Sequence, residues 1–327
     1  MVHERAQLEL VAGVDIDPDK VGRDVGSIIG LKKPLGVKAV RSIGELGDHF
    51  EADIVLHTTN SFFPEFEPQI LAILDAGFDV VSTSEELSFP WGSHSEGAVE
   101  LDSAAKKAGK TVLGTGVNPG FLMDWLPLRL TAICQRVDHI DVKRVINAST
   151  RRGPFQLKIG AGLSVEEFKA RISAGTMGHI GLRESAGMVF HAFGKELAGF
   201  QSSVEPITTD QKKETPYILA QPGQVIGIMQ DASASTEDGE FLKLTFVAAL
   251  DAREEQDTIT ISGKPNLEVR LRGTNGDFAT AAIAVNAIPR VLEANPGLVT
   301  MYDLPTPACW EWPSTKLHIS PDMGRPV

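Results

Sequence analysis

The chain has 327 residues, which is enough for about two domains. It is 42% hydrophobic and has a net charge of -12 with interspersed acids and bases, which argues against nucleic acid or an anionic membrane as partner. No apolar run of about 18 residues predicts a membrane span, and residues 1–7 lack the apolar segment of a signal peptide. Composition therefore favours a soluble, cytoplasmic enzyme. Cys134 and Cys309 have no metal-ligand spacing, so we expect two free thiols and no metal.

The first part of the chain predicts strands that alternate with helices, which is typical of a parallel sheet in a nucleotide-binding domain. The predicted strands are 8–17, 37–40, 52–60, 78–82 and 111–113. The predicted helices are 18–29, 43–49, 64–76, 93–108 and 122–134.

Asp15 ends the first apolar run, where dinucleotide folds place an acid on the adenosine ribose. The alternative is a carboxylate that caps the next helix, a role that Asp17 could also fill. In a dinucleotide fold this acid follows a strand and a Gly-x-Gly-x-x-Gly turn by about 20 residues, and no such turn precedes Asp15 here. We expect coding sequence before Met1 to supply that strand and loop; otherwise the chain is a truncated and inactive product.

Three polar stretches follow predicted strands, at the edge where open α/β sheets bind ligands. His57, Thr58 and Thr59 can contact a cofactor, or they form an ordinary polar loop. Glu85 and Glu86 are flanked by apolar residues that raise a carboxylate pKa, or they begin a helix.

The third stretch, residues 114–121, has three glycines, a proline and Asn118 in eight positions. This composition predicts a sharp turn that lets the backbone approach a ligand. The alternative is a tight strand-to-helix turn with a capping asparagine.

The second part of the chain has a different pattern. We predict a strand at 137–146, helices at 165–174 and 182–197, and an antiparallel sheet from the alternation at 258–271. Arg151 and Arg152 can bind a carboxylate, or they lie in a solvated turn or an intersubunit contact. Asp277 is predicted to cap a helix at 278–292 that is buried on all sides, with Thr274 and Asn275 facing the cleft. A tail with five prolines is expected to be extended.

These patterns predict an α/β chain in three parts. Residues 1–125 form a Rossmann-type parallel sheet domain whose first strand is missing. Residues 126–275 form an α+β domain built on a largely antiparallel sheet, for substrate binding and dimerisation. Residues 276–327 form a buried helix and a tail that return to the first domain.

Five runs in order resemble one family over almost the whole chain. They are Val14–Gly22, Ser84–Leu87, Gly114–Phe121, Ala148–Arg152 and Gly276–Ala282. They resemble 2,4-diaminopentanoate dehydrogenases and the related native NAD(P)-dependent amine dehydrogenases, of the dihydrodipicolinate reductase-like fold. The His-His-x-x-Lys run of dihydrodipicolinate reductase itself is not found.

The resemblance implies a homodimer that uses NADP or NAD to deaminate an amine oxidatively, releasing ammonia, or to aminate a ketone in reverse. It implies Glu85 as the catalytic carboxylate, with Glu86 as the alternative. It implies cofactor contacts at Asp15, Ile16, His57, Thr58, Thr59, Asn118, Pro119 and Gly120. It implies a substrate contact at Arg151 or Arg152, and Thr274 and Asn275, predicted above to face the cleft, complete the expected substrate site.

Cofactor preference and reaction both have alternatives. Asp15 favours NAD by repelling a 2′-phosphate, whereas Lys20 and Arg23 can offset that charge. The alternative functions are a related NAD(P)-dependent reductase of an amino acid or carbonyl compound, and a non-catalytic dimeric sensor.

Overall fold

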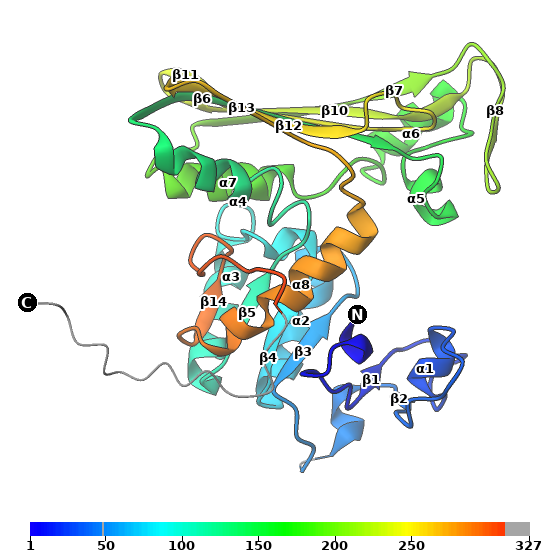
Figure 1. Cartoon of the computed structure of the whole chain (residues 1–327), viewed down its shortest axis with the longest axis vertical. Helices are drawn as coiled ribbons and strands as arrows, with labels where there is room; N and C mark the ends of the chain where they lie inside the picture. Colours follow the sequence, from blue (N-terminus) through cyan, green and yellow to red (C-terminus); the bar gives the residue numbers. More distant parts are fainter. Residues whose placement is uncertain (48, 311–327) are drawn as a thin grey trace, which may run out of the picture.

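A computed structural model describes residues 1–47 and 49–310. The chain forms two layered halves, with a parallel sheet and its helices below and a long sheet above (Figure 1). Within the described residues, no helix is both long enough and apolar enough to span a bilayer.

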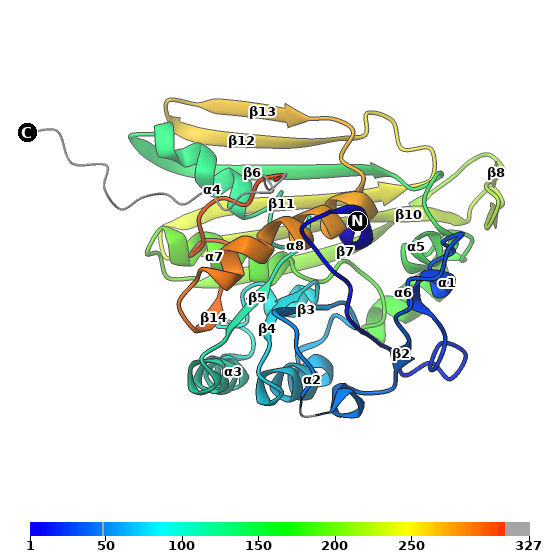
Figure 2. The same ribbon diagram turned by 60° about the horizontal axis from the view of Figure 1, so that its bottom comes forward.

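The parallel sheet confirms the predicted βα pattern of the first half. Its strands follow the order β14-β5-β4-β3, with bounds β3 Ile54–His57, β4 Asp79–Ser82, β5 Thr111–Gly114 and β14 Gly297–Val299. Helices α2 (Phe63–Asp75) and α3 (Ser95–Ala108) cover one face, and α8 (Gly276–Leu292) covers the other (Figure 2). Helix α2 has proline at its start and Gly77 after its end, as predicted.

The N-terminal region is less regular than predicted. Strands β1 (Gly13–Val14) and β2 (Ala39–Val40) pair only with each other, and no strand within the described residues joins the outer edge of β3. The predicted helix at 18–29 is wrong: only α1 (Val25–Ile28) forms, because Asp24 caps it and the preceding residues turn around two aspartates. Residues 2–4 and 43–46 form the short 3₁₀ helices η1 and η2.

The upper sheet follows the order β13-β12-β6-β11-β10-β7, and it is antiparallel except between β11 and β6. Its strands are β6 Arg136–Asn147, β7 Gly199–Thr208, β10 Val225–Thr236, β11 Gly239–Ala249, β12 Gln256–Lys264 and β13 Leu267–Leu271. The associated elements are α4 Trp125–Leu130, η4 Thr131–Ile133, α5 Gly153–Lys158, α6 Val165–Ser173, α7 Leu182–Ala192, β8 Lys213–Glu214 and β9 Leu219–Ala220. The helix predicted at 122–134 is therefore interrupted, because Asp124 caps α4 only at Trp125.

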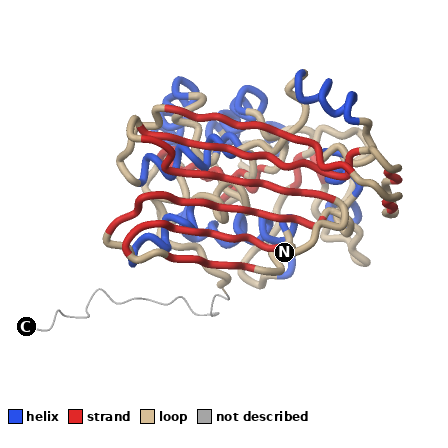
Figure 3. Tube along the Cα trace, turned by 90° about the horizontal axis from the view of Figure 1, so that it is seen from above, coloured by secondary structure: helices blue, strands red, loops and turns tan. Residues whose placement is uncertain are grey.

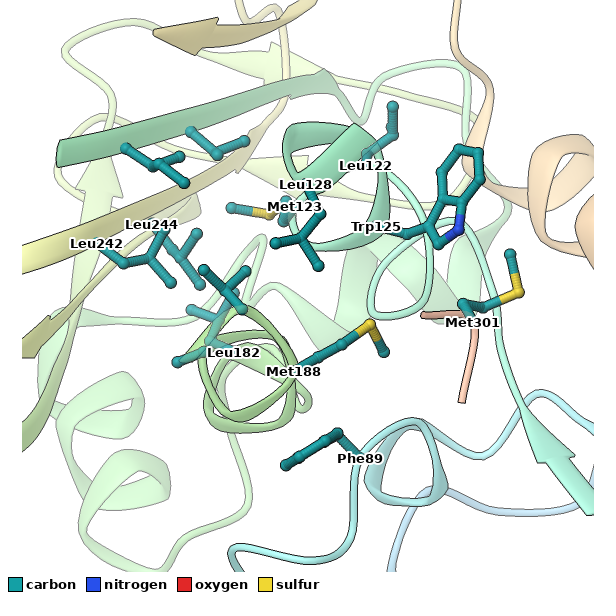
Figure 4. Close-up of a cluster of buried hydrophobic side chains, with 14 of the residues drawn as sticks. Phe89, Leu122, Met123, Trp125, Leu128, Leu182, Met188, Leu242, Leu244 and Met301 are labelled. Atoms are coloured by element: carbon teal, nitrogen blue, oxygen red, sulfur yellow. The ribbon is translucent and has the colours of Figure 1, made fainter. Parts of the chain in front are cut away.

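One hydrophobic core joins the two halves. Side chains of α4 and α7 pack between the upper sheet and the parallel sheet (Figure 4). The labelled members of this core are Phe89, Leu122, Met123, Trp125, Leu128, Leu182, Met188, Leu242, Leu244 and Met301. The opposite face of the upper sheet faces the viewer in Figure 3, with helices behind the strands.

Two predictions about the C-terminal part are wrong. Helix α8 is not buried on all sides, because Phe278 is 76% exposed while Ala284, Ala287 and Val291 face the sheet. Its cap is Asn275, whose side chain accepts from the Asp277 and Phe278 amides, and Asp277 lies inside the helix. Pro305 and Pro307 lie in irregular chain, whereas Pro313, Pro321 and Pro326 lie outside the described residues.

Gly114 lets the last residue of β5 touch the loop that carries Glu85 and Glu86. A Cβ atom on Gly114 would lie 2.3 Å from the Leu87 carbonyl carbon. Gly114→Ala should therefore lower the free energy of unfolding by about 1–3 kcal/mol, as overpacking does. Urea unfolding measures this, with Gly44→Ala as control, since its Cβ would meet only Ser42 Oγ at 3.9 Å. Equal stability of the two variants would contradict the close contact.

Candidate active site

Unpartnered polar atoms gather where β3, β4 and β5 end. Asn60 Oδ1, Ser84 Oγ, Thr115 Oγ1 and Asn118 Oδ1 are buried, and none has a hydrogen-bond partner within the described residues. Each follows one of three adjacent parallel strands, so all four lie toward the same edge of the sheet. Buried polar groups need partners, and this edge is where such sheets bind ligands. The residues present therefore fit a nicotinamide nucleotide, whose hydroxyl and amide groups would supply those partners.

Glu85 and Glu86 differ in what holds them. Glu86 Oε2 accepts from the Phe63 amide at 2.6 Å and lies 3.1 Å from His94 Nε2. Glu85 is half-buried, and its carboxylate has no hydrogen bond or ion pair within residues 1–47 and 49–310. Its backbone is fixed, because its carbonyl accepts from the amide and the hydroxyl of Ser88. Glu86 thus caps α2, while the Glu85 carboxylate has no partner within the described residues.

The hinge loop, residues Gly114–Phe121, connects the sheet edge to the second half. Asn118 Nδ2 lies 2.8 Å from His179 Nε2, so the neutral imidazole accepts from the amide. The following peptide bond, Asn118–Pro119, is cis. The Gly120 amide donates to Asp124, and the Val117 amide donates to Thr280 Oγ1 on α8.

His57 packs behind the edge, with Ser82 Oγ 2.8 Å from Nδ1 and Thr59 Oγ1 2.9 Å from Nε2. Burial lowers the pKa of His57, opposed by its hydrogen bond to Gln69. Ser82 Oγ in turn accepts from the Ser84 amide at 3.1 Å. His57 is therefore a neutral support for the loop of Glu85.

A basic cluster lies at the start of α8. Arg151 makes a bidentate pair with Asp277, at 3.2 Å and 2.9 Å, whereas Arg152 is 70% exposed and lies 3.5 Å from Asp277. Arg144 is 2% exposed, and its Nη1 is 3.5 Å from Asp257 with no hydrogen bond. A Cβ on Gly276 would lie 3.3 Å from Arg151 and 3.8 Å from Arg144. Arg144 and Arg151 therefore face the same helix start.

The other predicted residues have local partners or are exposed. Asp15 Oδ2 binds Lys20 Nζ at 2.6 Å, which lowers the Asp15 pKa. Ile16 is 79% exposed, and Thr58 is exposed. Thr274 bonds Asp257, and Asn275 caps α8.

Sequence reasoning missed His179 and Arg144. His179 stands in a loop without a motif, and only folding brings its ring onto Phe246, 4.4 Å between centroids. Arg144 lies at an inward position of β6, where alternation predicts an apolar residue. In the sequence, His179 could be noticed only as a polar residue beside a glycine, and Arg144 only as a basic residue a few positions before Arg151 and Arg152.

Comparisons with known proteins show which family this chain is similar to. The sequence pattern of the 2,4-diaminopentanoate dehydrogenase C-terminal domain matches residues 121–318. A 2,4-diaminopentanoate dehydrogenase of Acetoanaerobium sticklandii is 38% identical over 78% of this chain and 74% of its own length. An amine dehydrogenase of Streptomyces virginiae is 24% identical over 93% of this chain and 91% of its own.

The solved structure of an amine dehydrogenase from Mycobacterium smegmatis matches with a TM-score of 0.82 and 25% identity, covering 92% of this chain and 90% of that one. The fold, the sheet edge and these likenesses define an NAD(P)-dependent dehydrogenase of the amine dehydrogenase type. The chain belongs to the 2,4-diaminopentanoate dehydrogenase family.

His179 should contribute a pH dependence of stability. The residue is partly exposed, but burial of its ring, with the charges of Lys158 and Arg144, lowers the His179 pKa to about 3. In the unfolded chain the imidazole takes up a proton below about pH 6.5, so stability is lost as the pH falls from there toward 3. Between about pH 7 and pH 5, the free energy of unfolding should fall by about 1–2 kcal/mol more in the wild type than in His179→Gln. Chemical denaturation checks this. Exposed His49→Gln is the control and should follow the wild type.

Proposed function

We propose that the chain oxidises a small amine that also carries a carboxylate, with 2,4-diaminopentanoate as the leading substrate, and releases ammonia. The observation that carries this proposal is the unpaired Glu85 carboxylate beside the unpartnered polar atoms of the sheet edge. Family membership supplies the amine chemistry.

The bound nicotinamide supplies the acceptor for the hydride that leaves the amine-bearing carbon. The residues of the chain hold the substrate in place and move protons. Asn118 and Thr115 offer polar atoms at the hinge loop, and Ser84 offers its hydroxyl beside Glu85. The Glu85 carboxylate stabilises the iminium left on the substrate. It then accepts a proton from the water that attacks that carbon.

The basic cluster supports an anionic substrate. Arg144, Arg151 and Arg152 outnumber their partners Asp257 and Asp277 by one charge. Arg151 is already paired by Asp277, so we assign the substrate carboxylate first to Arg144, whose Nη1 has no hydrogen bond. A guanidinium binds a carboxylate through two parallel hydrogen bonds.

The setting of Asp15 supports use of NADP. Lys20 neutralises the carboxylate that would repel a 2′-phosphate. Arg41 follows β2 directly, and β2 pairs with the strand that ends before Asp15. Lys20 pairs with Asp15, and Arg41 follows Val40, whose carbonyl accepts from the Asp15 amide, so these two cations are our candidates for binding that phosphate.

We further propose a cytoplasmic homodimer formed through the uncovered face of the upper sheet. Asp141, Lys143 and Lys243 point to this face, since their neighbours along each strand are buried. Their mixed charges suit a self-complementary contact. We also propose the domain boundaries at residues 125 and 275, because α8 packs on the parallel sheet and β14 joins that sheet as a strand.

Lys20→Ala should shift cofactor preference toward NAD. Loss of one charge-assisted hydrogen bond to the 2′-phosphate should raise KM for NADP by about tenfold, and the freed Asp15 carboxylate should leave KM for NAD unchanged or lower. Steady-state kinetics with both cofactors measure this, and exposed Lys33→Ala controls for the lost charge. Parallel changes for both cofactors would rule out a role at the 2′-position.

Glu85→Gln should lower kcat by about 10² to 10⁴-fold, the usual loss when a general base is removed. Binding of NADPH should change little, because the amide keeps the size of the side chain. The measurement is steady-state oxidation of the amine, together with cofactor titration by fluorescence. Glu86→Gln is the matched comparison and should mainly reduce stability, since Glu86 caps α2. A larger kcat loss in Glu86→Gln than in Glu85→Gln would move the assignment by one residue.

A further inference from the structure

Helix α7 contacts both loops of the sheet edge. Its cap, Gly181, lies against the hinge loop, since a Cβ there would be 2.5 Å from Pro119 Cδ. Two turns later Gly187 admits the ring of Phe89, since a Cβ there would be 2.6 Å from that ring. Helix α7 is thus in close contact with the hinge loop on one side and with the segment after Glu85 on the other.

Adjacent residues of the first turn of α7 make one polar contact to each loop. Ser185 Oγ donates to Asp124 Oδ2 at 2.8 Å, next to the hinge loop. Glu184 Oε1 accepts from Ser93 Oγ at 3.0 Å, in the turn between Glu85 and α3. Glu184 is 5% exposed, although it is an acid. The contact of Glu184 joins the upper half of the molecule to the loop of Glu85.

The surroundings of Glu184 disfavour a negative charge. Burial raises the pKa of Glu184 to about 7, and the nearby Glu86 carboxylate adds to this. Its hydrogen bonds and Arg183 oppose the shift, but Arg183 is exposed and its guanidinium lies over the Phe200 ring. His94 is paired with Glu86, and Asp124 on the other side of α7 is itself an acid.

We propose that Glu184 is a positioning residue for the reaction, and that its buried carboxyl group holds Ser93, and through Ser93 the Glu85 loop, against α7. The proposal rests on the proposed function. Glu184 touches neither substrate nor cofactor; it sets where Glu85 stands relative to Asn118. Ionisation places a second buried charge beside Glu86, so the contact loosens as the pH rises through about 7.

We therefore expect an upper limb in the pH profile of kcat, that is, a fall of kcat at high pH, which the general base Glu85 does not cause. In the wild type kcat should fall above about pH 7. Glu184→Gln keeps the shape of the side chain and the oxygen that accepts from Ser93, but it does not titrate. Its kcat at about pH 6 should therefore stay within about twofold of the wild type, and the upper limb should vanish. Exposed Glu166→Gln, also in the first turn of a helix, is the control and should keep the wild-type profile.

Two measurements are independent of activity. Because the folded-state pKa lies above the ordinary value of 4.5, the wild type loses stability as the pH rises from about 4.5 to 7. Glu184→Gln lacks that loss, so its Tm should exceed that of the wild type at about pH 8 more than at about pH 5. Hydrogen exchange of peptides covering residues 84–94 should be faster in Ser93→Ala, which removes the contact at an exposed side chain, and in Glu184→Ala.

An upper limb that persists in Glu184→Gln would overturn the proposal, as would unchanged exchange of residues 84–94 in both contact variants. If the wild type oxidises no amine, the proposed function fails, and the exchange and unfolding results still decide whether Glu184 holds the loop.

Discussion

A buried carboxylate, Asp124, fixes the place where the two halves of the molecule meet. It accepts from the Gly120 amide at 2.7 Å, the Trp125 amide at 2.6 Å and Ser185 Oγ at 2.8 Å, and its side chain is fully buried. Burial raises the Asp124 pKa, and these three donors oppose the shift. An acid without a cation is tolerated in a core only when donors satisfy it. The hinge loop therefore cannot move independently of α7.

This constraint brings chemistry from both halves together. The parallel sheet supplies polar atoms at its edge, and the upper half supplies a basic cluster from β6 and the loop between β6 and α5, which faces the start of α8. His179 lies between them, because Gln230 bonds both its amide and its carbonyl while Asn118 bonds its ring. In the proposed reaction, the amine of the substrate would lie at the sheet edge and its carboxylate would lie at the basic cluster.

The sequence predicted β3, β4 and β5 of the parallel sheet, because their apolar runs and helix caps are local signals, but it did not predict β14, which joins the sheet from the far end of the chain. The helix predicted at 18–29 failed because Asp15 and Asp17 accept from backbone amides in turns, so that α1 begins only after its cap, Asp24. The loops of Asn118 and of Glu85 and Glu86 could be singled out as candidates from their glycines and adjacent acids. Glu184, Arg144 and His179 were not, because burial by distant segments gives each its role. The apolar pattern of α8 also overstated its burial, since Phe278 faces solvent.

We propose that this sheet edge performs amine dehydrogenation. The most direct measurement follows NADPH formation and ammonia release from 2,4-diaminopentanoate by the purified protein in the same reaction. The account predicts equal amounts of the two products, and in reverse a ketone should be consumed with NADPH only when ammonia is present. NADPH consumption by a ketone at an undiminished rate without ammonia would contradict the account and indicate a carbonyl reductase.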